Sequence, residues 1–189
     1  MAHAIHWRND HAAVLAEAAE ADRPALLCAF GPGKGSQRLR EVTWADPRVA
    51  DMVNRLSIPY GFEIDQQPAL CERHGIVWRP MVLLCDGRAR VGHRVVGYLP
   101  PEEMLAQLPL GVGKMRFMQG RWAESEGHFA AVADEFPGTE AAPEAQYWLG
   151  ASRYQREGKP HGLTEAWNTL MDRWPASRWA TRASVIRDG

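Results

Sequence analysis

"RPALLCAFGPGKGSQRL", residues 23–39, decides the fold class of this chain. Its apolar run Ala25–Phe30 has the length of a strand that is buried on both faces. Glycines at positions 31, 33 and 35 then indicate a turn, and the segment from Ser36 onward has a helical pattern. A buried strand that leads through a glycine-rich turn into a helix is typical of α/β folds.

The segments around this stretch extend the pattern over the first 108 residues. A helix is expected before the strand, over Asn9–Ala21, with Asn9 or Asp10 as its N-cap. After the turn we expect, in chain order, a helix within 44–56, a strand at 58–65, a helix at 66–76, a hairpin turning at Asp86-Gly87, and a helix at 100–108. A βαβ unit followed by an antiparallel hairpin predicts a mixed sheet with helices on both faces.

The stretch "PLGVG", residues 109–113, interrupts this pattern, and everything after it reads as helix. We therefore expect two domains, 1–109 and 110–189. The second half is also self-similar, because the segment that starts at Gly113 aligns with the segment that starts at Gly150. The aligned pairs are Phe117 with Tyr154, Gly120 with Gly158, Phe129 with Trp167, and Val132 with Leu170, and the endings "DEFPGT" and "DRWPAS" correspond.

The segments "EAQYWLGASRYQREG" and "RWPASRWATRA" carry a family resemblance. They resemble tetratricopeptide (TPR) repeats, most closely a bacterial subtype. The resemblance implies all-α TPR-like helical hairpins with a C-terminal cap and a concave surface for a partner; the alternative is a generic helical bundle. Ser125 and Leu163 depart from the repeat, which has a small alanine there. Near the cap we expect Trp174 and Trp179 to be exposed and to bind that partner.

The first half resembles thioredoxin-fold proteins over Ile5–Leu108, through "AEADRP" before the strand, "ADPRVADMVN", "IPYGFEID" and "VWRPMVLLCDG" in the family's order. The resemblance implies an α/β thioredoxin-like fold in which Pro80 is cis. It also places the family's C-x-x-C motif on Gly33-Lys34-Gly35-Ser36. Dithiol exchange needs an attacking thiolate and a resolving thiol, and neither is present at these positions.

In active relatives the backbone before the cis-proline pairs with an extended substrate peptide beside the cysteines. The resemblance therefore implies a peptide-binding groove formed by Gly33, Lys34, Ser36, Trp78, Arg79 and Pro80. The alternative is that Pro80 only shapes the fold. The positions of Lys34, Arg38 and Arg40 also allow a weak anion site at the turn, although the P-loop and dinucleotide glycine motifs are both incomplete; a solvated turn is the alternative.

The three cysteines offer a different kind of chemistry. Cys28 and Cys85 lie in apolar runs that the fold makes neighbouring strands, and Cys71 lies in an expected helix. We expect all three to be inert packed thiols. A thiol-disulfide oxidoreductase or redox sensor that uses these non-motif cysteines is the alternative function.

Bulk composition excludes several classes of function. The formal net charge of −1 predicts no nucleic-acid partner, and no run is apolar enough to predict a membrane span or a secretory signal. Three scattered cysteines favour a reducing compartment, and we expect a cytoplasmic protein. We expect no cofactor and no metal. Apart from His3-x-x-His6, the histidines show no spacing that is typical of metal ligands. The sequence predicts a redox-inactive adaptor or chaperone-like protein that binds a partner protein or extended peptide, in an oligomeric state it does not define.

Overall fold

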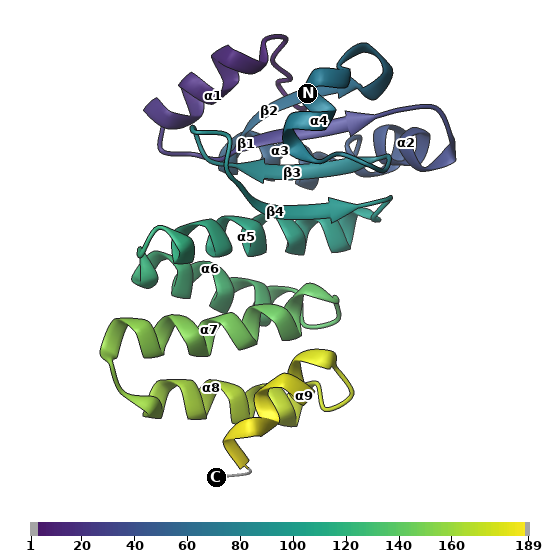
Figure 1. Cartoon of the computed structure of the whole chain (residues 1–189). Helices are drawn as coiled ribbons and strands as arrows, with labels where there is room; N and C mark the ends of the chain where they lie inside the picture. The colour runs from purple at the N-terminus through teal and green to yellow at the C-terminus, as the bar shows by residue number, and fades with distance from the viewer. Residues whose placement is uncertain (1–3, 188–189) are drawn as a thin grey trace. The chain divides into compact units, whose positions relative to one another are not determined.

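The computed structural model describes residues 4–187 of the chain. Contacts divide it into two compact units, Met1–Gly111 and Val112–Gly189, which we call the sheet unit and the helical unit. The sheet unit holds a four-stranded sheet with flanking helices, and the helical unit holds helices alone (Figure 1).

The sheet unit contains the elements that the sequence predicts, in the predicted order. The strands are β1 (Ala25–Phe30), β2 (Ile58–Glu63), β3 (Met81–Cys85) and β4 (Val91–Val96). The helices are α1 (His11–Glu20), α2 (Lys34–Arg38), the π-helix η1 (Leu39–Thr43), α3 (Pro47–Leu56), the 3₁₀ helix η2 (Ile64–Gln66), α4 (Pro68–His74) and α5 (Pro101–Met118). Asp10 and Asp46 accept hydrogen bonds at the starts of α1 and α3, so aspartate caps begin both helices.

The sheet is mixed, with the strand order β2-β1-β3-β4. Strand β1 pairs in parallel with β2 and antiparallel with β3, and β3 continues into the antiparallel hairpin with β4. Every residue of β1 is buried, as expected for a central strand covered on both faces. Val14 and Ala18 of α1 and Leu70 of α4 share a core with Leu27, on one face of the sheet.

Helix α5 corrects the predicted break at residues 109–113. The helix continues through this stretch, with Pro109 inside it. The two glycines serve close packing here rather than helix termination. A Cβ on Gly111 would lie 2.5 Å from Leu84 Cδ1, and a Cβ on Gly113 would lie 2.7 Å from Phe129 Cε1. The contact boundary between Gly111 and Val112 therefore falls within a continuous helix.

The helical unit consists of antiparallel hairpins and a terminal segment. It contains the end of α5, then α6 (Trp122–Glu135), α7 (Ala141–Glu157), α8 (Pro160–Arg173), α9 (Arg178–Ala183) and the 3₁₀ helix η3 (Ser184–Arg187). Trp179, Ala180 and Ala183 of α9 pack against Trp167, Leu170 and Met171 of α8. The C-terminal segment thus covers the apolar face of the last hairpin, as expected of a cap.

The internal repeat appears in the contacts of the aligned residues. The aligned glycines Gly113 and Gly150 each lie against an aromatic ring, that of Phe129 in one case and that of Trp167 in the other. Gly120 and Gly158 both adopt positive φ, at 74° and 65°. At the hairpin ends, the N–H of Phe136 donates to Val132 and that of Trp174 donates to Leu170.

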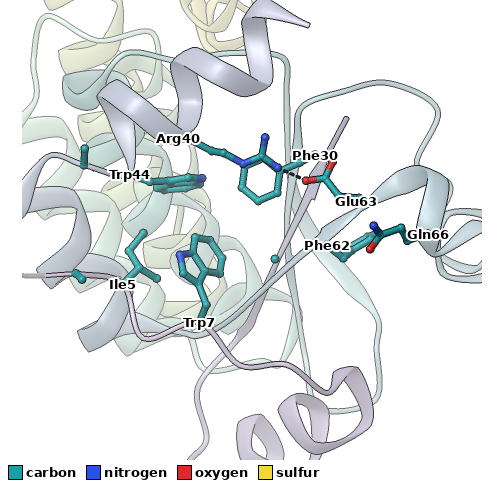
Figure 2. A pocket seen from close by; sticks show the side chains of 11 residues that line it. Ile5, Trp7, Phe30, Arg40, Trp44, Phe62, Glu63 and Gln66 are labelled. Atoms are coloured by element: carbon teal, nitrogen blue, oxygen red, sulfur yellow. Dashed lines mark hydrogen bonds and ion pairs between the residues drawn. The ribbon is translucent and has the colours of Figure 1, made fainter. Parts of the chain in front are cut away.

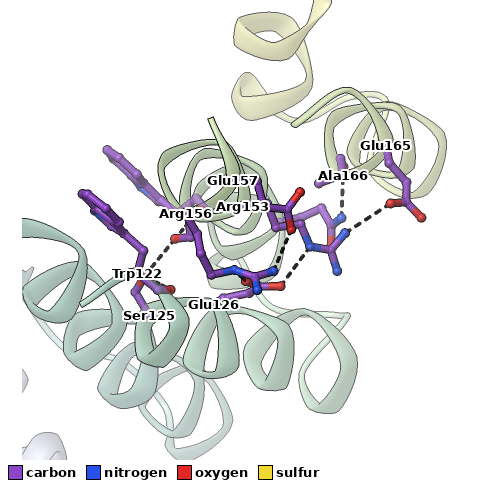
Figure 3. A network of polar contacts seen from close by, with 11 residues as sticks. Trp122, Ser125, Glu126, Arg153, Arg156, Glu157, Glu165 and Ala166 are labelled. Atoms are coloured by element: carbon purple, nitrogen blue, oxygen red, sulfur yellow. Dashed lines mark hydrogen bonds and ion pairs between the residues drawn. The ribbon is translucent and has the colours of Figure 1, made fainter. Parts of the chain in front are cut away.

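Polar contacts connect successive helices of this unit (Figure 3). Ser125 and Ser152, both buried, share a hydrogen bond of 2.9 Å between α6 and α7. This pairing gives the serine at position 125 a hydrogen-bond partner inside the unit. Glu126 of α6 pairs with Arg153 and Arg156 of α7, and Arg153 also reaches Glu165 of α8.

Candidate functional site

The glycine-rich turn lies against the predicted cis-proline. The Arg79–Pro80 bond is cis, as predicted. Gly33 precedes α2 as its N-cap with φ of 121°, a conformation that favours glycine. A Cβ on Gly35 would lie 3.0 Å from Pro80 Cδ, and a Cβ on Gly31 would overlap the side chain of Arg79. Small residues in the turn therefore allow the two loops to approach closely.

Ser36, which the resemblance places at the position of the resolving thiol, has a structural role. Its side chain is buried, with 2% of the residue exposed, and its hydroxyl accepts a hydrogen bond of 3.1 Å from the backbone N–H of Gly31. The hydroxyl thus holds the turn to the start of its helix. Gly33, at the position of the attacking thiol, has open space where a side chain would be.

A pocket of about 300 Å³ lies between the turn and the loop that precedes Pro80. Gly33, Ser36, Trp78 and Arg79, four of the predicted site residues, line it together with Pro32, Gly35, Ile64 and Val77. Pro80 does not line the pocket itself but packs against Gly35, which does. Lys34 is exposed and does not line the pocket. Val77 and Trp78 are 87% and 63% exposed, an unusual degree for large apolar side chains.

Val77, Trp78 and Arg79 are exposed, and their backbone groups have no hydrogen-bond partner among the described residues. Among the described residues, no hydrogen bond joins the N–H or C=O groups of these three residues to any other group. Exposed apolar side chains next to unpaired backbone donors and acceptors are the features that an added strand can use.

Two of the cations that the sequence places near the turn, Arg38 and Arg40, contact other side chains instead of the turn. The guanidinium of Arg38 lies 4.7 Å from the centre of the Tyr98 ring, and that of Arg40 stacks on Phe30 and pairs with Glu63. The α2 helix has five residues, too few for a developed helix dipole. Of the three cations that the sequence offered for an anion site, Arg38 and Arg40 thus have other contacts, and Lys34 remains.

The strand pairing separates the two buried thiols. Cys28 pairs with Val82, and Cys85 pairs with Ala25, three positions away along β1. Because side chains alternate between the two faces of a sheet, the thiols of Cys28 and Cys85 lie on opposite faces. Their strands are neighbours, as expected, but these two sulfurs cannot form a disulfide.

Burial also makes the thiols poor nucleophiles. Complete burial raises the pKa of the Cys28 thiol far above its usual value, and burial raises the pKa of Cys85 to about 12. Cys71 is half-buried, and its pKa is also raised, chiefly by burial and then by Asp65. None of the three has the lowered pKa of a reactive cysteine.

A second, larger recess was missed by the sequence analysis (Figure 2). It has a volume of about 690 Å³ and lies beside the carboxyl ends of β1 and β2. Its walls are mainly aromatic, with the Arg40–Glu63 ion pair on one side; the aromatic residues are Trp7, Phe30, Trp44 and Phe62. Trp7 reaches the recess because Arg8 forms a bridge with Tyr60, a long-range contact without a local sequence signal.

The two C-terminal tryptophans differ from the prediction. Trp179 is 6% exposed, so the expectation that it is exposed is wrong. It is buried because its ring packs against Tyr147 and lies beneath the side chains of Arg178 and Arg182. Trp174 is half-buried, and its indole N–H donates to the carbonyl of Pro137 at 2.8 Å. Tyr154, which aligns with Phe117, is 44% exposed.

The histidines form one close pair in the part of the chain that the structure describes. The Nε2 atoms of His11 and His74 lie 3.3 Å apart, between α1 and α4. Residues 4–187 contain no group of three or more metal-ligating side chains, and His3 of the His3-x-x-His6 spacing lies outside the described residues. Within the same residues, no helix combines the length and the apolar character that crossing a bilayer requires.

Comparison with solved structures tests the resemblance of the sheet unit. A candidate disulphide-isomerase from Bacteroides thetaiotaomicron is 26% identical, with a TM-score of 0.51, over 59% of this chain and 96% of its own. A thioredoxin from Thermus thermophilus is 18% identical, with a TM-score of 0.54, over 64% of this chain and 96% of its own.

The sheet unit has a thioredoxin-like fold. Its mixed four-stranded sheet and flanking helices match this assignment. No protein-family model matches the chain, and no curated protein matches it either. The thioredoxin-like fold explains why the glycine-rich turn and the cis-proline meet at one pocket.

Proposed function

We propose that the protein is a redox-inactive adaptor or chaperone-like protein that binds extended segments of partner proteins beside Pro80. One observation carries the proposal: the backbone of Val77–Arg79 is unpaired and flanks a pocket with exposed apolar side chains. An extended peptide would pair with this backbone and place one side chain in the pocket. Gly33 supports such binding because no side chain fills the space above the turn.

The helical unit supports a second part of the proposal. Its repeated glycine–aromatic contacts and matching hairpin ends fit two TPR-like hairpins with a capping helix. We propose TPR-like repeats for residues 110–189, a thioredoxin-like domain for residues 1–109, and a cytoplasmic location. Repeats of this kind present a second surface for a protein partner.

A binding titration tests the pocket directly. The probe is a fluorescently labelled small protein that has been reduced and carboxymethylated, so that it stays unfolded. We expect the full chain to bind it, and Trp78→Ala to weaken binding at least fivefold, because the variant removes the exposed apolar surface of the pocket. Val185→Ala, which truncates a similarly exposed apolar side chain far along the chain, is the matched control. Equal affinities for Trp78→Ala and Val185→Ala would argue against the pocket.

Thiol–disulfide exchange is the second candidate function. It is favoured by the name of the Bacteroides structure, a candidate disulphide-isomerase. In this chain such activity would depend on Cys28, Cys71 or Cys85, whose pKa values are all raised. Reduction of insulin disulfides and thiol labelling of the native protein at pH 8 distinguish the two candidates. The adaptor proposal predicts no turnover and labelling of Cys28 and Cys85 only after unfolding; turnover that is lost in a cysteine variant would establish the second.

A further inference from the structure

Two arginines of the helical unit differ from all its others. Within the described residues, Arg178 and Arg182 of α9 form no ion pair and no hydrogen bond through their side chains. The remaining arginines of the unit each pair with a carboxylate; they are Arg116, Arg121, Arg153, Arg156, Arg173 and Arg187. Carboxylates of the unit thus pair with its other guanidinium groups, and the guanidinium groups of Arg178 and Arg182 are available to bind a ligand.

The ring of Trp179 holds both guanidinium groups in place. Their central carbons lie 5.5 Å and 4.5 Å from the centre of the same ring, for Arg178 and Arg182 respectively. A guanidinium that stacks on an aromatic face keeps its N–H donors free at its edge. Ordering these long side chains in advance reduces the entropy lost when a ligand binds. Trp179 itself is fixed by its contact with Tyr147, 5.1 Å away between ring centres.

The spacing of the two arginines indicates how the ligand is built. They are four residues apart on a helix, so their Cβ atoms lie about 6 Å apart on one face. Alternate side chains of an extended chain are about 6.6 Å apart on one side. Two carboxylates at alternate positions of an extended peptide therefore match the spacing at which the two arginine side chains leave the helix.

We propose that α9 is a docking site for an acidic, extended segment of a partner protein, with carboxylates at alternate positions. The proposal rests on the protein-binding function proposed above and adds the chemistry of one partner. Charge complementarity selects this occupant. Among the described residues of the helical unit, two guanidinium groups lack an ion pair, those of Arg178 and Arg182. Nucleic acid requires a broad basic surface, and this chain has a net charge of −1. The apolar face of α9 is buried against α8, so it is not available to a lipid bilayer.

The test uses the full chain and two labelled peptides, Gly-Glu-Gly-Glu-Gly-Glu-Gly and its glutamine counterpart. In about 50 mM salt, we expect the glutamate peptide to bind at least tenfold more tightly, with an affinity that falls as salt rises. Arg178→Gln combined with Arg182→Gln should lower that affinity at least tenfold. Arg55→Gln combined with Arg88→Gln changes the net charge equally, at exposed arginines of the sheet unit, and should leave binding intact.

Three results would overturn the proposal. They are equal binding of the two peptides by the full chain, undiminished binding by the double α9 variant, and tighter arginine-dependent binding to duplex DNA or anionic vesicles than to the glutamate peptide. The first of these needs no assumption that the variant folds. The Trp78→Ala variant should bind the glutamate peptide normally, so that failure of the pocket and failure of the α9 site are distinguishable.

Discussion

Ser36 has a structural role in the glycine-rich turn. Its hydroxyl accepts the N–H of Gly31 inside the protein, where water cannot replace the bond. A buried N–H that loses its only partner costs about 1–3 kcal/mol. The turn beside Pro80 therefore depends on this side chain for its shape rather than for chemistry.

Replacing Ser36 by alanine tests this task. We expect Ser36→Ala to lower the free energy of unfolding by about 1–3 kcal/mol, because the Gly31 N–H is then left without an acceptor. Ser184→Ala is the control, since that hydroxyl donates to Thr181 in an exposed position and its loss should cost less than about 0.5 kcal/mol. Urea denaturation followed by circular dichroism measures both. A loss in Ser36→Ala no larger than in Ser184→Ala would contradict the assigned role.

Some of these residues could be located from sequence, and others could not. Gly33, Ser36 and Pro80 were placed by the resemblance to thioredoxin-fold proteins, whose sequence segments occur in this chain in the family's order. The burial of Trp179 depends on arginines that cover its ring, and no local pattern encodes that contact. Trp7 joins the large recess through the bridge between Arg8 and Tyr60, which are far apart in sequence.

At the scale of elements, the glycines within the helices differ in whether a neighbouring side chain occupies the position of a Cβ. The stretch at 109–113 was expected to interrupt the pattern, but Gly111 and Gly113 lie inside a helix and face neighbouring side chains at distances that no Cβ allows. The same holds for Gly150 in α7. Gly127 in α6, by contrast, has nothing near the position of a Cβ. Helix periodicity alone does not distinguish these cases.

Alanine substitutions should separate the two kinds of glycine. Gly127→Ala should raise the free energy of unfolding by about 0.5–1 kcal/mol, because alanine favours the helix and meets no neighbour. Gly150→Ala should lower it by about 1–3 kcal/mol, because its Cβ would lie 2.8 Å from Trp167 Cδ1. Thermal or urea unfolding measures both variants. Stabilisation by Gly150→Ala would show that the two hairpin helices are not closely packed there.

The pairing of α1 with α4 predicts a dependence on pH. Burial lowers the pKa of His74, and nearby His11, Arg73 and Arg94 lower it further; burial and then Arg73 lower that of His11, against the opposite effect of Asp10. Tyr60 also faces His11, but its own pKa is raised, and it stays neutral in this range. Because the folded-state pKa values lie below the unfolded value of about 6.5, the unfolded chain binds more protons below that pH.

Stability should therefore be fully present above about pH 6.5 and should decrease as the pH falls through the lowered values. We expect urea midpoints to fall between pH 7.5 and pH 5, and to fall less in His11→Gln combined with His74→Gln. The lowered pKa values of Asp46 and Asp86 act in a separate, more acidic range. An equally steep decrease in the double variant would assign the effect to other groups.

At the scale of the whole molecule, the thioredoxin-like fold of the sheet unit brings the glycine-rich turn, the cis-proline and the pocket together. The turn carries no thiol, and Gly33 has open space where a side chain would be. The order of elements and the internal repeat could be predicted because both follow from local periodicity. The unpaired backbone of Val77–Arg79 and the free arginines of α9 could not, since both depend on the hydrogen bonds and ion pairs that the rest of the chain forms.

Amide hydrogen exchange at Val77, Trp78 and Arg79 tests the central claim most directly. These N–H groups have no partner in the described structure, so they should exchange quickly in the free protein. Addition of the reduced, carboxymethylated chain at saturating concentration should slow exchange at these residues and leave exchange in α6 unchanged. Binding of that chain with unchanged exchange at Val77–Arg79 would contradict strand pairing beside Pro80.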